Sequence, residues 1–367
     1  MKKIIILIFI FIILFLNVSC NKQEYAYKTY YLDETFSITP IITIMDEINV
    51  IENLNIENDL NEITLNLDKK FNVFKEDSLI TKVNNNSGIK EIEVDDEFIF
   101  VLQNAINVSK NIEAHHQKSL YDVSIYSVWK EWGFHNNYYQ YGNYSSSPSF
   151  EVIKRKLPLV NYKDIIINNE KNTVFFKTKG MMIDLGSIVK GYAADKIASY
   201  LKTLNLNNCL IDVGGNIVTL GKNVATLKNW KVGILAPYTY DTEIGYIIAN
   251  DSYETFVTSG IYERYIVEKN KETNEEIMYH HILNPNTGYP EDNDLLSVTI
   301  ITKQSIIADG LSTAIFLMGS AKGMEYVNAN NDIDAIFITK NKEILVSNNI
   351  ENRFVINKDI YNFCYIF

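Results

Sequence analysis

The chain has 367 residues and a formal net charge of −11 at pH 7, and 47% of its residues are hydrophobic. This length and apolar fraction suffice for one large domain, or two intertwined lobes, with a sizeable core. The acidic balance and the lack of a basic run argue against nucleic acid as a partner.

The N-terminus predicts export. Lys2 and Lys3 precede an apolar run from Ile4 to Leu16, which is shorter than the about 20 residues of a membrane span. Cys20 follows Ser19, a pattern typical of bacterial lipoprotein cleavage and lipidation. A simple signal peptide or an uncleaved anchor is the alternative. We expect a signal peptide at 1–19, lipidation at Cys20 and a polar tether over 20–35.

The first half of the chain alternates strand and helix patterns. We expect a strand at 41–50, helices at 59–74 and 95–114, a loop over 77–88 and a surface loop over 138–149. Short strands follow at 165–167, 173–177 and 182–185, and a helix spans about 187–204.

The second half is rich in strands. They are expected at 209–213, 217–220, 231–235, 244–249, 253–257, 297–302, 333–339 and 343–346, with a helix at 305–318 and a short helix after it. This order predicts an α+β fold with helices packed on mostly antiparallel sheets. Cys209 and Cys364 are expected to be buried thiols, and their pairing stays open.

Two glycine-containing segments are candidates for phosphate binding. In DLGSIVKGYAAD, Ser187 can cap a helix whose first turn carries Lys190, and Gly191 indicates close approach by a bulky group. An ordinary amphipathic helix is the alternative. In DVGGN, Gly214 and Gly215 permit positive φ and an anion-binding nest, or simply a β-turn.

Chemistry is predicted where a polar loop precedes the last apolar helix. His281 lies in that loop beside Asn284, Pro285 and Gly288, where a histidine can exchange protons or bind phosphate. Asp309 and Thr313 lie four residues apart and so share one helix face. Their oxygens suit a hard cation such as Mg²⁺, unless Asp309 is a helix-start residue and Thr313 bonds back to a carbonyl.

These segments together resemble the ApbE family of FAD:protein FMN transferases, which are mostly exported and often lipid-anchored. The likeness is carried by MIDLGSIVKGYAADKIASYL, CLIDVGGNIVTLG, VTSGIYERY and HHILNPNTGYP…ADGLSTAIFLMG, with a weaker block, FNVFKEDSLITKVN and LYDVSIYSVWKEWGF, before them. The resemblance implies an ApbE-like, T-fold-related α+β domain over 36–350 with FAD bound between lobes, followed by a C-terminal tail at 351–367.

The resemblance also assigns roles to residues. It implies Mg²⁺ bound by Asp309, Thr313 and the backbone carbonyl of Ser187, with His281 and Asp309 as catalytic residues. The implied FAD contacts are Phe74, Asp122, Ser124, Lys190, Asp195, Gly214, Gly215, Ser259, Gly260 and His281. Asn284 stands where the family often has Asp, Phe74 where Tyr is common, and Asp33–Thr35 where the family has a Met-Gly-Thr-like strand.

The expected reaction transfers FMN from FAD to a Thr or Ser hydroxyl of an acceptor flavoprotein, such as an Rnf- or Nqr-type redox subunit, and releases AMP. Two alternatives remain open at this point. One is a periplasmic FAD pyrophosphatase that uses water, and the other is a flavin-binding or storage lipoprotein. The Asp309–Thr313 pair argues against pure binding, since storage needs no catalytic metal.

Overall fold

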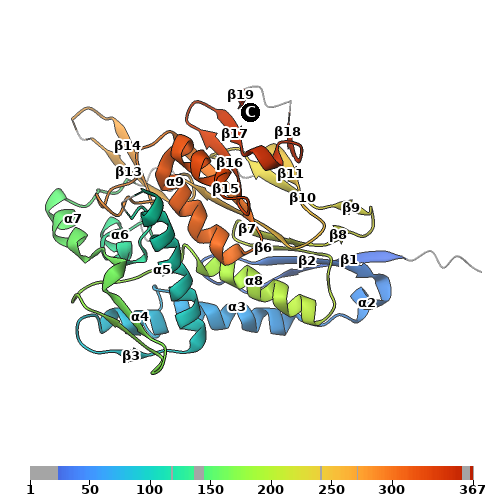
Figure 1. Cartoon of the computed structure of the whole chain (residues 1–367), viewed down its shortest axis with the longest axis horizontal. Helices are drawn as coiled ribbons and strands as arrows, with labels where there is room; N and C mark the ends of the chain where they lie inside the picture. The colour runs from blue at the N-terminus through green and yellow to red at the C-terminus, as the bar shows by residue number, and fades with distance from the viewer. Residues whose placement is uncertain are drawn as a thin grey trace, which may run out of the picture.

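A computed structural model describes residues 24–116, 119–135, 144–239, 242–270, 272–357 and 364–366. Its centre is a nine-stranded sheet in the order β1-β2-β6-β7-β12-β15-β16-β17-β19 (Figure 1). Neighbouring strands are antiparallel except β17 and β19, which are parallel. The bounds are β1 (Tyr25–Tyr31), β2 (Ile41–Glu47), β6 (Cys209–Val213), β7 (Asn216–Leu220), β12 (Glu254–Gly260), β15 (Leu295–Thr302), β16 (Asp334–Thr339), β17 (Glu343–Val346) and β19 (Cys364–Ile366).

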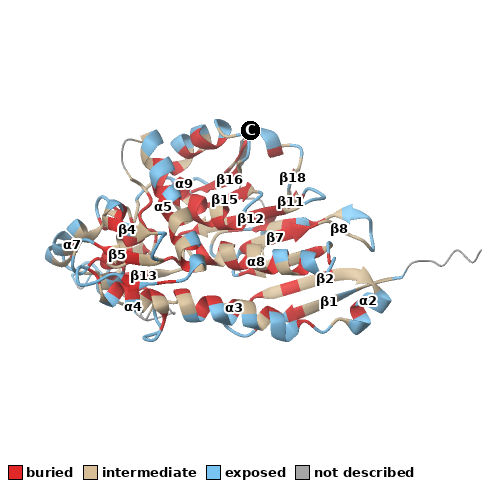
Figure 2. Ribbon diagram, turned by 60° about the horizontal axis from the view of Figure 1, so that its bottom comes forward, coloured by how far each residue is buried: buried red, intermediate tan, exposed pale blue. Residues whose placement is uncertain are grey.

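Helices cover one face of this sheet (Figures 1 and 2). They are α8 (Val189–Thr203) and α9 (Ser305–Asn328), flanked by α3 (Glu57–Phe71) and α5 (Asp96–His116). Their buried apolar stripes and the strand residues beneath form the main core. Gly319 breaks α9 with φ 76°, which confirms the predicted helix at 305–318 and a further helix after it. None of the helices that the structure describes is long and apolar enough to cross a bilayer.

A smaller sheet covers part of the other face. It contains β10 (Lys231–Leu235), β11 (Glu243–Ile248) and β18 (Phe354–Ile356) in that order. Trp230, Val232 and Ile247 pack there against Phe256 and Ile338 of the large sheet. The fold is therefore α+β, with helices on mostly antiparallel sheets as predicted.

A third group of elements extends the molecule beside α5. Here α6 (Tyr126–Trp132) and α7 (Phe150–Lys156) pack on the hairpin of β13 (Tyr265–Lys269) and β14 (Glu276–His280). Trp132 stacks on Phe134 with ring centroids 5.6 Å apart. The remaining elements are α2 (Ile48–Asn53), α4 (Leu79–Asn85), β3 (Ile92–Glu93), β4 (Ile165–Asn168), β5 (Thr173–Phe176), β8 (Lys222–Asn223), β9 (Lys228–Asn229) and the short 3₁₀ turns η1 (Val123–Ile125), η2 (Leu157–Leu159), η3 (Tyr162–Asp164) and η4 (Asn348–Ile350).

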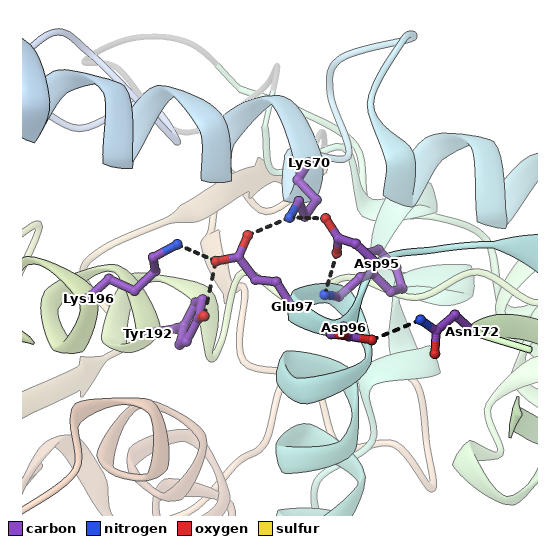
Figure 3. Close-up of polar contacts among 8 residues, drawn as sticks. Lys70, Asp95, Asp96, Glu97, Asn172, Tyr192 and Lys196 are labelled. Atoms are coloured by element: carbon purple, nitrogen blue, oxygen red, sulfur yellow. Dashed lines mark hydrogen bonds and ion pairs between the residues drawn. The ribbon is translucent and has the colours of Figure 1, made fainter. Parts of the chain in front are cut away.

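An ion-pair network joins three helices. Glu97 at the start of α5 bonds to Lys70 of α3 and to Lys196 of α8, and the Tyr192 hydroxyl donates to Glu97 over 3.0 Å (Figure 3). Burial works against the charge of Glu97, but the two lysines outweigh it and lower the Glu97 pKa. The network holds the C-terminal end of α3, which leads into Phe74, against α8.

Several predicted boundaries are wrong. The tether predicted over 20–35 includes β1, and the tail at 351–367 includes β18 and β19, because both segments complete sheets. The strand expected at 41–50 ends at Glu47, where α2 begins. The loop over 77–88 contains α4, whose first turn Ser78 caps by accepting a bond from Thr81 N–H. Residues 182–185 form no strand.

The cysteines and the N-terminus are partly outside the described residues. Cys209 is buried and unpaired, and burial raises the pKa of its thiol to about 12. Three predicted features lie outside the described residues: the side chain of Cys364, residues 138–143 of the surface loop, and the signal peptide with Cys20.

Candidate functional site

A cavity of about 750 Å³ opens between the large sheet with its helices and the aromatic cluster of α6. Its size is that of a small-molecule site. The walls come from α8, α9, the β6–β7 turn, the loop after α3 and the segment after β14. The predicted site between lobes is therefore present as a cavity.

Asp309 faces this cavity from α9 and is 4% exposed. Its Oδ2 accepts the Gly191 N–H over 2.9 Å. Burial raises the Asp309 pKa, while the Lys190 charge and the Gly191 N–H act in the opposite direction. The amide of buried Asn216 also acts on this carboxylate, although neither of its polar atoms reaches hydrogen-bond geometry with a partner in the described chain. The carboxylate keeps capacity for a further partner.

Thr313 lies one turn further along α9 and lines the same cavity. Within the described chain, the contact of its hydroxyl is a long one, 3.5 Å to Ser259 Oγ. Ser312 makes the back-bond instead, from its hydroxyl to the Asp309 carbonyl over 2.8 Å. The alternative in which Thr313 serves its own helix is therefore wrong, and its oxygen remains available to a ligand.

Ser187 reaches the cavity from the turn before α8, but it does not cap that helix. The helix begins at Val189, and the Ser187 hydroxyl instead bonds the Tyr121 hydroxyl over 2.8 Å. Ser187, Asp309 and Thr313 thus line one cavity with hard oxygen donors, a donor set that fits Mg²⁺. Among the described residues no group of three or more His, Cys, Asp and Glu could hold a metal, so the set depends on one carboxylate and neutral oxygens.

The glycines near Lys190 have specific structural roles. Position 191 requires glycine because a Cβ there would lie 2.1 Å from the Ser305 carbonyl oxygen. The sequence predicts a bulky group close to Gly191, and in the structure that group is the backbone of α9. Gly214 and Gly215, with φ 60° and 86°, close the β6–β7 hairpin, and the Gly215 N–H bonds Asp212 Oδ1 over 2.9 Å. The β-turn alternative is therefore correct. Both glycines and Lys190 still line the cavity.

The two adjacent histidines differ. His280 uses both ring nitrogens inside the fold: Nε2 donates to the Glu291 carbonyl over 3.0 Å, and Nδ1 accepts from Ile282 N–H over 3.3 Å. His281 lines the cavity, and its Nδ1 lies 3.0 Å from the Arg264 carbonyl. Because a carbonyl only accepts, Nδ1 carries the proton and Nε2 is an unprotonated acceptor. Burial, and then the Arg264 charge, lower the His281 pKa to about 3.

Phe74 also lines the cavity and is 41% exposed. Its ring stacks on His135 with centroids 4.6 Å apart and lies 6.3 Å from Trp129. This arrangement leaves aromatic surface for a flat ligand, and the contact of Phe74 with a flavin stays a prediction. Ser259 and Gly260 line the cavity from the end of β12.

Two predicted FAD contacts lie outside the cavity. Asp195 is absent from its lining because its carboxylate accepts the Ser305 and Ile306 N–H groups, at 3.0 and 2.9 Å, and so holds the start of α9. Ser124 is fully buried and bonds Asp122 over 2.6 Å. Asp122 does line the cavity, but its carboxylate also accepts the Tyr162 N–H over 2.9 Å and orders that loop.

Sequence reasoning missed several polar cavity residues, among them Tyr121, Asp184 and Arg264. Asp184 accepts the Gly186 N–H over 2.9 Å, and burial raises its pKa while the Arg264 charge opposes that rise. The signal for Asp184 was its place at the start of the DLGS turn. Periodicity gave no signal for Arg264, because the fold alone brings it beside His281.

Comparison with known proteins agrees with this architecture. The family profile described as "ApbE family" matches residues 34–337. A curated FAD:protein FMN transferase of Klebsiella pneumoniae is 36% identical over 240 residues, covering 64% of this chain and 68% of the relative. One of Treponema pallidum is 28% identical over 293 residues, covering 76% and 75%. The chain belongs to the ApbE family.

Solved structures show the same fold. The ApbE protein of Thermotoga maritima matches with a TM-score of 0.74 and 27% identity, covering 90% of this chain and 99% of that one. The flavin transferase ApbE of Vibrio cholerae matches with a TM-score of 0.73 and 21% identity over the same shares. These matches confirm the predicted ApbE-like fold. The protein is accordingly a transferase by class.

Proposed function

We propose that this protein is a FAD:protein FMN transferase that cleaves the FAD pyrophosphate, attaches FMN through a phosphoester to a Thr or Ser of an acceptor flavoprotein, and releases AMP. The observation that carries the proposal is the convergence of Asp309, Thr313, Lys190 and His281 on one cavity. The curated relatives named for this activity support it.

The residues divide the chemistry between them. Asp309, Thr313 and the Ser187 carbonyl are the groups that would hold Mg²⁺, which when bound neutralises charge on the pyrophosphate. Lys190 places a second positive charge in the same cavity. Phe74 offers its ring to the isoalloxazine.

His281 suits the role of proton acceptor. Its low pKa keeps it neutral at physiological pH, and the Arg264 carbonyl fixes the tautomer that leaves Nε2 free to accept. A pKa this low by itself makes a weak base, and the negative charge of a bound pyrophosphate would raise the His281 pKa toward the working pH. We infer that Nε2 accepts the proton of the incoming hydroxyl as its oxygen forms the bond to phosphorus. AMP then leaves with the electrons of the broken P–O bond.

The decisive experiment incubates the protein with FAD, Mg²⁺ and the soluble flavinylation domain of an Rnf-type subunit, and follows intact mass. The proposal requires one added FMN mass per acceptor and an equal amount of AMP. AMP release at the same rate without acceptor, and no mass added to protein, would instead identify a FAD pyrophosphatase. Binding of FAD without turnover would indicate a storage protein.

We further propose that the protein is exported and anchored by a lipid at Cys20, with residues 1–19 removed as the signal. The sequence pattern around Cys20 supports this. In cells fed a fatty-acid analogue, the wild-type protein should label and enter the detergent phase, and Cys20→Ala should do neither. Equal labelling of both proteins would refute the anchor without affecting the proposed activity.

A further inference from the structure

β10 is an edge strand of the small sheet, and one side of its backbone is open. The order β10-β11-β18 gives β10 a neighbour on one side. The Ala249 N–H donates to the Trp230 carbonyl over 2.9 Å, so Trp230 faces β11, and Val232 and Ile234 do so by alternation. The N–H and C=O groups of Lys231 and Gly233 therefore point away from β11, and within the described chain no bond to them is present.

This open edge belongs to the wall of the cavity. Gly233, Ile234 and Leu235 line the same cavity as Asp309 and His281. An added strand at this edge would therefore run directly into the space where the reaction takes place.

The rim beside this edge exposes large apolar side chains. Leu235 is 41% exposed and Tyr238 51% exposed. The Tyr238 ring lies 5.7 Å from that of Tyr262, a cavity residue, and its hydroxyl reaches Met278 Sδ at 3.9 Å. Leu235 and Tyr238 also line the cavity, and they remain well exposed beside the open edge. A protein partner would cover them.

We propose that the β10 edge is the docking site for the acceptor: the segment carrying the flavinylated Thr or Ser pairs in an extended conformation with Gly233 and covers Leu235 and Tyr238. Main-chain hydrogen bonds would provide binding affinity without requiring a particular acceptor sequence, as in other cases of strand addition to a sheet edge. The inference rests on the proposed FMN transfer and adds to it how the hydroxyl is delivered.

Proline at position 233 tests the pairing. Gly233→Pro removes the outward N–H, which no bond within the described chain uses, and proline is tolerated on edge strands. We expect kcat/KM for the Rnf-type acceptor domain to fall about tenfold, the equivalent of one to two lost hydrogen bonds. The slow AMP release without acceptor should change less than about twofold.

Two matched variants control for side effects. Gly233→Ala keeps the N–H, and the atoms nearest to its Cβ belong to the flexible side chain of Glu243, from Cγ to Oε1, so acceptor transfer should persist. Ile356→Pro places the same ring on β18, the opposite edge of the same sheet; its N–H also points outward, because Asn357 N–H bonds the Ile244 carbonyl. It should transfer FMN as the wild type does.

The outcomes separate the two proposals. If Gly233→Pro loses AMP release together with transfer while its melting temperature is unchanged, the edge serves FAD, and the docking proposal is wrong. If it transfers normally, the proposal is equally wrong. If the variant does not fold, hydrogen exchange of the wild-type Lys231 and Gly233 amides decides: the acceptor domain must slow it, and unchanged exchange refutes docking. A wild type that transfers nothing would instead refute the proposed function.

Discussion

Two aspartates, 114 positions apart in the sequence, mark the two sides of the contact between α8 and α9: Asp309 is buried and Asp195 is half-buried. Asp195 reaches from α8 to the start of α9, where two backbone N–H groups and the Tyr253 hydroxyl occupy its oxygens. Asp309 reaches from α9 toward α8 but accepts one backbone N–H and faces the cavity. Burial raises both pKa values. The difference is spare hydrogen-bonding capacity, and this capacity separates a structural carboxylate from one available to a ligand.

The sharpest test of this contrast is Asp309→Asn. The amide keeps the shape but loses the charge that would hold a cation, so metal-dependent FMN transfer should fall by about 100-fold or more. The free energy of unfolding should stay equal or rise, because a poorly compensated buried charge is removed. AMP release and thermal unfolding measure the two effects. A fully active variant would make Asp309 a structural residue like Asp195.

Gly191→Ala should disturb both aspartates at once. Its Cβ would collide with the Ser305 carbonyl oxygen at 2.1 Å, and backbone cannot yield as a side chain does. We expect the two helices to separate, with a loss of about 2–4 kcal/mol in the free energy of unfolding. Denaturant titration measures it, and the pair Ser199→Ala and Ser199→Gly, at an exposed position of the same helix, gives the contribution of helix propensity alone. An unchanged stability would contradict the close helix contact.

Asp195→Asn should have the opposite profile to Asp309→Asn. The loss of charge-assisted bonds to the α9 N–H groups should lower the free energy of unfolding by about 1–3 kcal/mol. Transfer per folded molecule should stay near that of the wild type, because the side chain does not line the cavity. A selective rise in the KM for FAD without loss of stability would restore the predicted ligand contact.

A further expected effect concerns His281 and the pH dependence of stability. Its folded pKa, about 3, lies below the ordinary value of 6.5, so the unfolded chain binds the proton first as pH falls. The stability contributed by neutral His281 is present above pH 6.5 and is lost on acidification toward pH 3. His281→Gln should therefore flatten the wild-type loss of stability between about pH 6.5 and 4. Parallel stability curves would show that His281 titrates normally.

Much of the fold was predictable because its apolar periods are regular. The helix at 305–318 and the strands at 209–213 and 231–235 have the expected bounds. The exceptions depend on tertiary contacts. Residues 25–31 read as polar and aromatic without period because β1 is an edge strand with much of its surface exposed, and α6 is short and held by aromatic packing.

Some residues of the candidate site were predicted correctly to line the cavity, and others were not. Asp309, Thr313, Lys190 and His281 share one cavity as expected, since local motifs carry them. Asp195 and Ser124 matched motifs equally well, but the backbone groups that occupy Asp195 belong to a helix 110 residues away. A motif shows which residues recur together; the fold decides which of their atoms remain unoccupied.

The start of β1 has a consequence for where this protein can work. β1 begins at Tyr25, five residues after Cys20, and a fully extended chain advances at most about 3.6 Å per residue. In the proposed lipoprotein the start of β1 would stay within roughly 18 Å of the bilayer surface. β1 begins at the end of the molecule away from α6 and the β13–β14 hairpin (Figure 1). Acceptors would then be met by two-dimensional diffusion and at high local concentration, which favours redox subunits embedded in the same membrane.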